Sequence, residues 1–199
     1  PYSKFDGKDT YEGLSNQERY RFVEFHKWKF NSSWFTALTN KFVLNTKVGF
    51  GYLGSYDKNL GQSPFERFYL GGDGLSGFNL DGSEIIALRG YADRALSPNI
   101  GATMVSKYTM EIRYPLSLNP TATIYGLGFV EAGNSWFDFD DFTPFEVRRS
   151  AGVGVRIYMP FFGLLGLDWG YCFDEIPGVT VPNQKTEFHF TMGGNIGGW

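Results

Sequence analysis

The sequence predicts an all-β fold, in which about seven antiparallel strands form the C-terminal portion of a transmembrane β-barrel. Apolar and polar residues alternate with a period of two along most of the predicted strands. These strands approach or exceed the roughly nine to eleven residues that a strand needs to cross a bilayer. Their connections alternate between short and long, as do the connections at the two rims of outer-membrane barrels.

The composition indicates one domain, residues 1–199, and excludes several classes of protein. No run of apolar residues reaches the ~18 that a membrane helix needs. The net charge of −3 gives no electrostatic support for a nucleic-acid partner. The single cysteine, Cys172, excludes an internal disulfide. The first residues lack the pattern of a signal peptide, so we expect a mature protein or a fragment.

The alternation predicts strands over 20–30 (with an end as late as residue 35), 41–56, 102–116, 121–136, 146–159, 164–173 and 185 to the C-terminus. The clearest of these is 102–116, where Met110 and Ile112 share one face and Lys107, Thr109 and Glu111 share the other. Residues 117–120 are expected to form a tight turn, and residues before 20 the end of a strand and a loop. The facing of the first strand stays open, because its alternation is imperfect.

Seven strands cannot close a bacterial outer-membrane barrel, which has an even number of about eight or more. Open strand edges in lipid would leave backbone groups unpaired, so we expect the earlier strands to be missing from this chain. A soluble β-sandwich or a lipocalin-like barrel stays open as an alternative, since alternation alone does not exclude it. The many small residues and threonines on the polar faces count against that alternative.

A long loop, expected over 57–101, is rich in glycine and yet apolar, which is typical of a functional loop. It contains Arg89, which follows the apolar run 85–88. A lone cation in such surroundings implies a carboxylate partner elsewhere in the chain. Glu111 and Glu131, on the polar faces of consecutive strands, are the candidates. The alternative is that these glutamates pair instead with lumen cations, namely Lys107, Arg113, Arg148 or Arg156.

The same loop carries a family resemblance. Leu88-Arg89-Gly90-Tyr91 resembles the [V/L/I]-R-G-[F/Y] signature of the loop that folds into the lumen of BamA-type outer-membrane barrels, and 68–72 resembles the aromatic-x-Gly-Gly segment before it. Residues 128–133 resemble a lumen-facing strand motif of the family, with Glu131 in place of Asp, and 110–112 resemble the acidic position of the preceding strand. The resemblance covers nearly the whole chain. It implies a complete barrel of sixteen strands behind POTRA domains, with the loop folded inward and Arg89 held by Glu111 and Glu131.

The resemblance also implies a function. A BamA-type protein of the bacterial cell outer membrane inserts and folds other β-barrel proteins there, without ATP, a cofactor or a metal. The implied partners are outer-membrane lipids, unfolded β-barrel client proteins and accessory assembly lipoproteins. A client strand would add by β-augmentation at a weak lateral seam, formed here by Gly193, Gly194, Gly197, Gly198 and Trp199. The alternatives are a two-partner secretion transporter of the same superfamily, or an ordinary outer-membrane porin or receptor.

Three further patterns carry less weight. Residues 72–77 fit the G-x-G-x-x-G pattern of dinucleotide-binding loops, but no helix is predicted to follow them. Asp138, Asp140 and Asp141 could bind calcium, although a solvated acidic loop is the favoured interpretation. His26 and His189 are far apart in the sequence and lack a nucleophile motif, so we predict no enzymatic activity.

Overall fold

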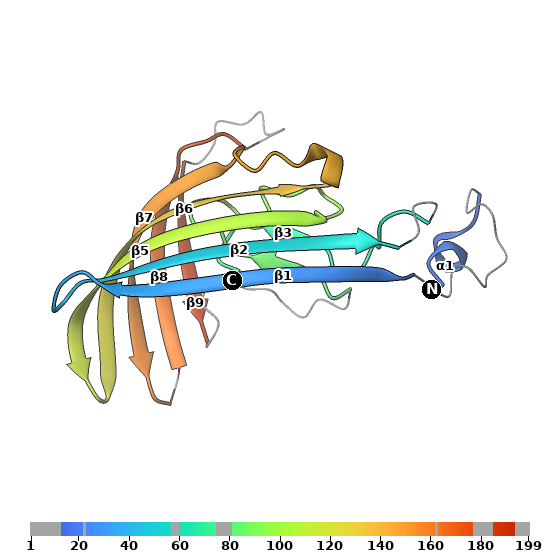
Figure 1. Ribbon diagram of the computed structural model, residues 1–199. Coiled ribbons are helices and arrows are strands. Elements are labelled where there is room, and N and C mark those ends of the chain that lie inside the picture. Colours follow the sequence, from blue (N-terminus) through green and yellow to red (C-terminus); the bar gives the residue numbers. More distant parts are fainter. Residues whose placement is uncertain are drawn as a thin grey trace.

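The fold is a seven-stranded antiparallel sheet, which confirms the predicted class. The computed structural model describes residues 13–21, 23–56, 60–74, 81–161, 163–176 and 185–193. Figure 1 shows the sheet curling into an open half-barrel, in the strand order β1-β2-β5-β6-β7-β8-β9. Its strands are β1 (Phe25–Ala37), β2 (Val43–Ser55), β5 (Met104–Asn119), β6 (Ala122–Trp136), β7 (Arg148–Met159), β8 (Gly163–Cys172) and β9 (Thr186–Met192).

The strand β5 is polar on its buried face and apolar on its exposed face. Tyr108, Met110 and Ile112 are between 40% and 54% exposed, whereas Lys107, Thr109 and Glu111 are at most 5% exposed. This is the reverse of a half-buried strand in a water-soluble protein, where the apolar face turns inward. It is the arrangement of a barrel strand that faces lipid on its outer side.

The same inversion runs through the strands that follow. Outward residues that are exposed and apolar include Val130, Val153, Leu167, Trp169, Phe188 and Phe190. Inward residues that are buried and polar include Glu131, Ser150, Arg156, Asp168, His189 and Thr191. The predicted alternation along these strands is therefore confirmed. In β1, where the facing was open, Trp28 and Phe30 are exposed and Phe25 packs against the core.

The first strand begins later than predicted. The described residues before Phe25 do not extend the sheet. Among them, Ser15 and Glu18 form a reciprocal capping box that starts a short helix, α1 (Asn16–Arg19). The Ser-x-x-Glu spacing is visible in the sequence and would have predicted this helical turn. Within the described part of the chain, no helix has the length and apolar character needed to cross a membrane.

The predicted turn at 117–120 is also wrong, because β5 continues through Asn119. The pairing of β5 with β6 shifts register between Pro115 and Ser117 and then resumes. A bulge of this kind absorbs one residue without ending the strand. The turn is therefore formed by Pro120 and Thr121, between the end of β5 and the start of β6.

The long loop supplies most of the apolar core. Its short strands β3 (Phe68–Leu70) and β4 (Glu84–Ile86) pair in parallel with each other, and they lie inside the curve of the sheet in Figure 1. The core joins loop and inner wall, and its buried members are Leu53, Phe68, Leu70, Ile86, Leu88, Tyr91, Leu96, Val105 and Cys172. The loop is thus packed against the inner face of the sheet.

The two outer strands of the sheet are β1 and β9, and no pairing joins them in the described part of the chain. Within those residues, each of the two strands has one edge that pairs with no other strand. In hydrocarbon each unpaired group would cost several kcal/mol, so the sheet needs further strands to close.

Candidate functional site

The site is built around Arg89, which its neighbours hold against the inner wall. Leu88 and Tyr91 on either side are fully buried in the apolar core. The backbone N–H of Tyr91 donates to the carbonyl of Leu88 at 3.4 Å, which closes a turn at the tip of the segment. Arg89 cannot follow its apolar neighbours into this core, so its side chain extends along the wall instead.

Two glycines allow this turn to lie directly on β8. Gly90 has a φ of +92°, a region that favours glycine, and a Cβ there would lie 3.1 Å from the side chain of Ser150. A Cβ on Gly170 would lie 2.6 Å from the backbone nitrogen of Gly90. Neither position has room for a larger residue unless the loop moves away from the wall.

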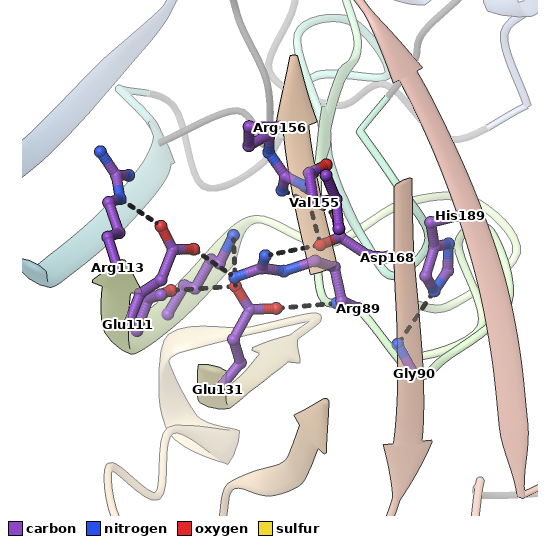
Figure 2. A network of polar contacts seen from close by, with 11 residues as sticks. Arg89, Gly90, Glu111, Arg113, Glu131, Val155, Arg156, Asp168 and His189 are labelled. Carbon is purple, nitrogen blue, oxygen red and sulfur yellow. Dashed lines mark hydrogen bonds and ion pairs between the residues drawn. The ribbon is translucent and has the colours of Figure 1, made fainter. Parts of the chain in front are cut away.

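Three carboxylates surround the guanidinium group of Arg89 (Figure 2). Its Nη2 lies 2.8 Å from Oε1 of Glu131 and 3.1 Å from Oε2 of Glu111. Its Nη1 lies 3.3 Å from Oδ1 of Asp168. The backbone N–H of Arg89 also donates to Oε2 of Glu131 at 2.8 Å, so this carboxylate binds both ends of the residue.

An aromatic ring completes the surroundings of the guanidinium. The Cζ atom of Arg89 lies 3.6 Å from the centroid of the Phe129 ring. Phe129 is buried and precedes Glu131 by two residues, so both side chains point inward from β6. Cation–π contacts of this kind are worth ~0.5–2 kcal/mol, depending on how dry the site is.

The alternative ion pairs are present together with those of Arg89. Nε of Arg113 lies 2.6 Å from Glu111, Nζ of Lys107 lies 3.7 Å from Glu131, and Nη2 of Arg156 lies 2.7 Å from Asp168. Each carboxylate therefore bridges Arg89 and a second cation on the wall. Of the cations considered from the sequence, Arg148 lies apart from this network, with its Nη2 3.6 Å from Glu146.

The network keeps Arg89 charged. Burial by itself would lower the pKa of Arg89, but the carboxylates of Glu131, Asp168 and Glu111 outweigh it and raise the pKa above its ordinary value. A charge buried in this way is stable only while its partners remain. Removing one carboxylate would leave the buried cations of the network with fewer negative charges to neutralise them.

The other residues of the motif attach to further strands. The backbone N–H of Gly90 donates to Nε2 of His189 on β9 at 2.9 Å. The hydroxyl of Tyr91 donates to the carbonyl of Arg149 on β7 at 2.9 Å. Burial, followed by the nearby charge of Asp174, raises the pKa of this hydroxyl, which therefore stays a donor. The motif thus contacts strands from β5 to β9.

Asp168, Phe129 and His189 were missed as partners of the loop. A signal was present for Asp168, which stands on the polar face of its strand between the outward-facing Leu167 and Trp169. Phe129 looks like an ordinary apolar residue, and His189 is separated from Gly90 by 99 residues. His189 carried the same signal as Asp168, since it stands between the outward-facing Phe188 and Phe190, whereas nothing in the local sequence of Phe129 indicates that it approaches the loop.

A polar cavity of about 290 Å³ adjoins the network. Its lining includes Lys47, Lys107, Glu111, Tyr125, Arg156 and Thr191. Both signs of charge line it, which suits water or a polar chain better than an apolar ligand. The described ranges contain no group of three or more His, Cys, Asp or Glu side chains arranged for a metal ion.

The remaining candidate residues lie elsewhere. Gly193 directly follows β9 with a φ of +118°, and its N–H donates to the carbonyl of Leu164 at 3.0 Å. Gly194, Gly197, Gly198 and Trp199 lie outside the described residues. Asp138, Asp140 and Asp141 are exposed, and Asp138 caps a single turn of 3₁₀ helix, η2 (Phe139–Asp141).

Comparison with known proteins identifies the family of the chain. The sequence matches the Omp85 superfamily domain over residues 10–196. No curated protein matches it. Among solved structures, BamA from Haemophilus ducreyi lacking POTRA domains 1–3 is similar, with a TM-score of 0.58 and 20% identity, over 84% of this chain and 34% of that chain. The chain thus spans about a third of the length of that structure. The similarity shows a shared fold. Because the domain match covers nearly its whole length, the chain belongs to the Omp85 superfamily.

Proposed function

We propose that this chain is the C-terminal part of a barrel that inserts and folds other β-barrel proteins into the bacterial outer membrane. The observation that carries the proposal is the contact of Arg89 with Glu111 and Glu131, at 3.1 and 2.8 Å. This contact fastens the inward loop to the wall of a half-barrel whose outer face is apolar, as a lipid-facing surface is. An ordinary porin or receptor does not need such a fastening.

In this proposal the loop acts as a latch. While Arg89 is bound, β5, β6 and β8 are tied through one residue, and the curvature of the wall is held. The last strand then remains free to pair weakly with the first strand of the complete barrel. Glycines such as Gly193 contribute no side-chain packing to that seam.

Clients enter at the seam in this mechanism. An unfolded β-barrel client would add its strand to an open sheet edge by β-augmentation, in which main-chain hydrogen bonds provide the affinity. Each new strand satisfies backbone groups that lipid cannot, so the process needs no ATP. We propose sixteen strands in the complete barrel, with outer-membrane lipids, client proteins and accessory assembly lipoproteins as partners.

One observation favours a second candidate. The polar cavity beside Arg89 could belong to a passage for an extended chain, as in a two-partner secretion transporter. The two candidates differ in their clients: an assembly factor acts on many membrane barrels, and a secretion transporter acts on its own exported partner.

The test compares Arg89→Ala with Arg94→Ala in the full-length protein, expressed in cells that depend on it. Arg94 is a cation of the same loop that stacks on Tyr69 and lies outside the carboxylate network. The amounts of several folded outer-membrane barrels are then measured by heat-modifiable gel mobility. We expect Arg89→Ala alone to reduce them, at a normal level of the protein itself. Normal barrel assembly with lost secretion of one exported protein would favour the transporter instead.

A further inference from the structure

The connection between β6 and β7, residues 137–147, has an unusual position on the barrel. It alternates aromatic and acidic residues at its start, in the order Phe137, Asp138, Phe139, Asp140 and Asp141. Phe142 packs edge-on against Trp136, with ring centroids 4.9 Å apart, and against Phe50, at 6.0 Å. We call this segment the rim loop.

The aromatic partners of the rim loop belong to the outer face of the sheet. Trp136 lies six positions after the outward Val130 in β6, so the two share a face. Phe50 lies two positions after Val48 in β2, and Val48 pairs with the outward Tyr108. Val130 is 55% exposed, but Trp136 is only 6% exposed. Met104, which pairs with Trp136 across the ladder and shares the strand face of Met110 and Ile112, is buried as well. The rim loop therefore covers the outside of the wall.

Hydrogen bonds hold the rim loop in this position. The N–H of Phe139 donates to the side chain of Asp138 at 2.6 Å, which caps η2. Nε1 of Trp136 donates to the Thr143 hydroxyl at 3.4 Å, and that hydroxyl donates to Glu146 at 3.1 Å. The Asn134 amide donates to the carbonyl of Glu146 at 2.7 Å. The loop is thus an ordered part of the wall.

The outer surface of the rim loop is aromatic. Phe139 is 61% exposed and Phe145 is 95% exposed, while the three aspartates are exposed beside them. Transferring a Phe side chain out of water into an apolar environment is favourable. Aromatic rings gather at the membrane–water boundary, where carboxylates can still reach water. The Phe139 ring packs against Tyr52 of β2, with ring centroids 6.2 Å apart, and so adjoins the outer face that exposes Tyr108 and Val130.

We propose that the rim loop is a lipid anchor, with Phe139 and Phe145 inserted at the headgroup–acyl boundary of the bilayer beside the barrel. Continuity with the apolar outer face selects lipid as the occupant. The proposal rests on the membrane placement of the barrel and is independent of its clients. The rim loop lies on the outer face, over β2, β5 and β6, and none of these is an edge strand of the sheet. The strands that complete the barrel therefore do not cover it.

The test uses the full-length protein in phosphatidylcholine vesicles that contain no other protein. Single cysteines at Phe145→Cys, Glu175→Cys and Met110→Cys receive a polarity-sensitive fluorophore, with the unsubstituted protein as the labelling control because Cys172 is buried. Glu175 is an exposed residue in the next long connection, and Met110 lies on the outer face of β5. Brominated acyl chains then serve as the quencher.

We expect lipid quenching and a blue-shifted emission at positions 110 and 145, and neither at 175. Quenching at 110 without quenching at 145 would overturn the anchor alone. Absence of quenching at 110 would overturn the membrane placement itself. If position 145 responds only after an accessory protein is added, the aromatic patch is a protein-docking surface and the lipid proposal is wrong.

Discussion

The backbone N–H of Gly90 donates a hydrogen bond of 2.9 Å to Nε2 of His189, and so joins the inward loop to β9. His189 stands opposite Asp168 in the ladder between β8 and β9, and Asp168 accepts a hydrogen bond from Arg89. One turn of the loop is thereby bound to two neighbouring strands. The position of the loop and the pairing of the last described strand are physically linked.

Replacing His189 should loosen this link. In His189→Leu the buried N–H of Gly90 loses its acceptor, at a cost of ~1–3 kcal/mol. His189→Gln keeps an acceptor and is the matched control. We expect hydrogen exchange to accelerate around Gly90 and along β9 in the leucine variant, with substantial rescue in the glutamine variant. Equal exchange in both variants and the native protein would contradict the link.

Replacing Arg89 should release the loop and leave most strands formed. The carboxylates of Glu111, Glu131 and Asp168 would remain buried without this cation, at a cost of up to about 3–5 kcal/mol. Limited proteolysis should then cleave within residues 81–91, and we expect this segment to resist cleavage in the native protein. A protected loop in Arg89→Ala would argue against its role as a latch.

A double-mutant cycle measures the pair directly. Arg89→Ala and Glu131→Gln should show a coupling free energy of at least about 0.5 kcal/mol in urea unfolding, because the two side chains are in contact. Arg94→Ala with Glu131→Gln is the control cycle and should be additive. Additivity in both cycles would show that the 2.8 Å contact contributes nothing specific to stability.

Adding side chains between loop and wall should displace the loop. Gly170→Ala places a Cβ 2.6 Å from the nitrogen of Gly90, and overpacking of this kind costs ~1–3 kcal/mol. Gly128→Ala is the control, because the nearest heavy atom to its Cβ would be the carbonyl oxygen of Gly152 at 4.0 Å. Thermal unfolding in detergent should distinguish the two variants, and similar losses in both would refute the close seating of the loop.

Charges on the outer face should destabilise the protein in lipid. Met110→Arg is expected to cost ~2–4 kcal/mol of stability near the middle of a bilayer. Arginine in place of Val153 or Leu167 should have a similar cost. Thr121→Arg, in the turn between β5 and β6, is the control and should change little. Urea titration in lipid vesicles gives the free energies. A tolerated arginine at 110 would contradict a lipid-facing wall.

The sequence by itself determined the number of strands, the alternating facing of those after the first, and the need of Arg89 for carboxylates. Period-two alternation is a local property of extended backbone, so Met110 and Glu111 separate to opposite faces whatever the curvature of the sheet. A cation within the apolar run of the loop also requires a partner wherever the loop lies. Together with the family resemblance, these constraints selected Glu111 and Glu131 as candidates.

Only the tertiary structure decided which inward side chains meet. Asp168, Phe129 and His189 reach the loop because the sheet curls and the turn at Gly90 lies flush on Gly170, and neither fact is written in any short stretch of sequence. The burial of Trp136 and Met104 on the outer face likewise depends on where the rim loop folds. Convergence across strands is set by curvature, register and loop path, which are collective properties of the packed chain.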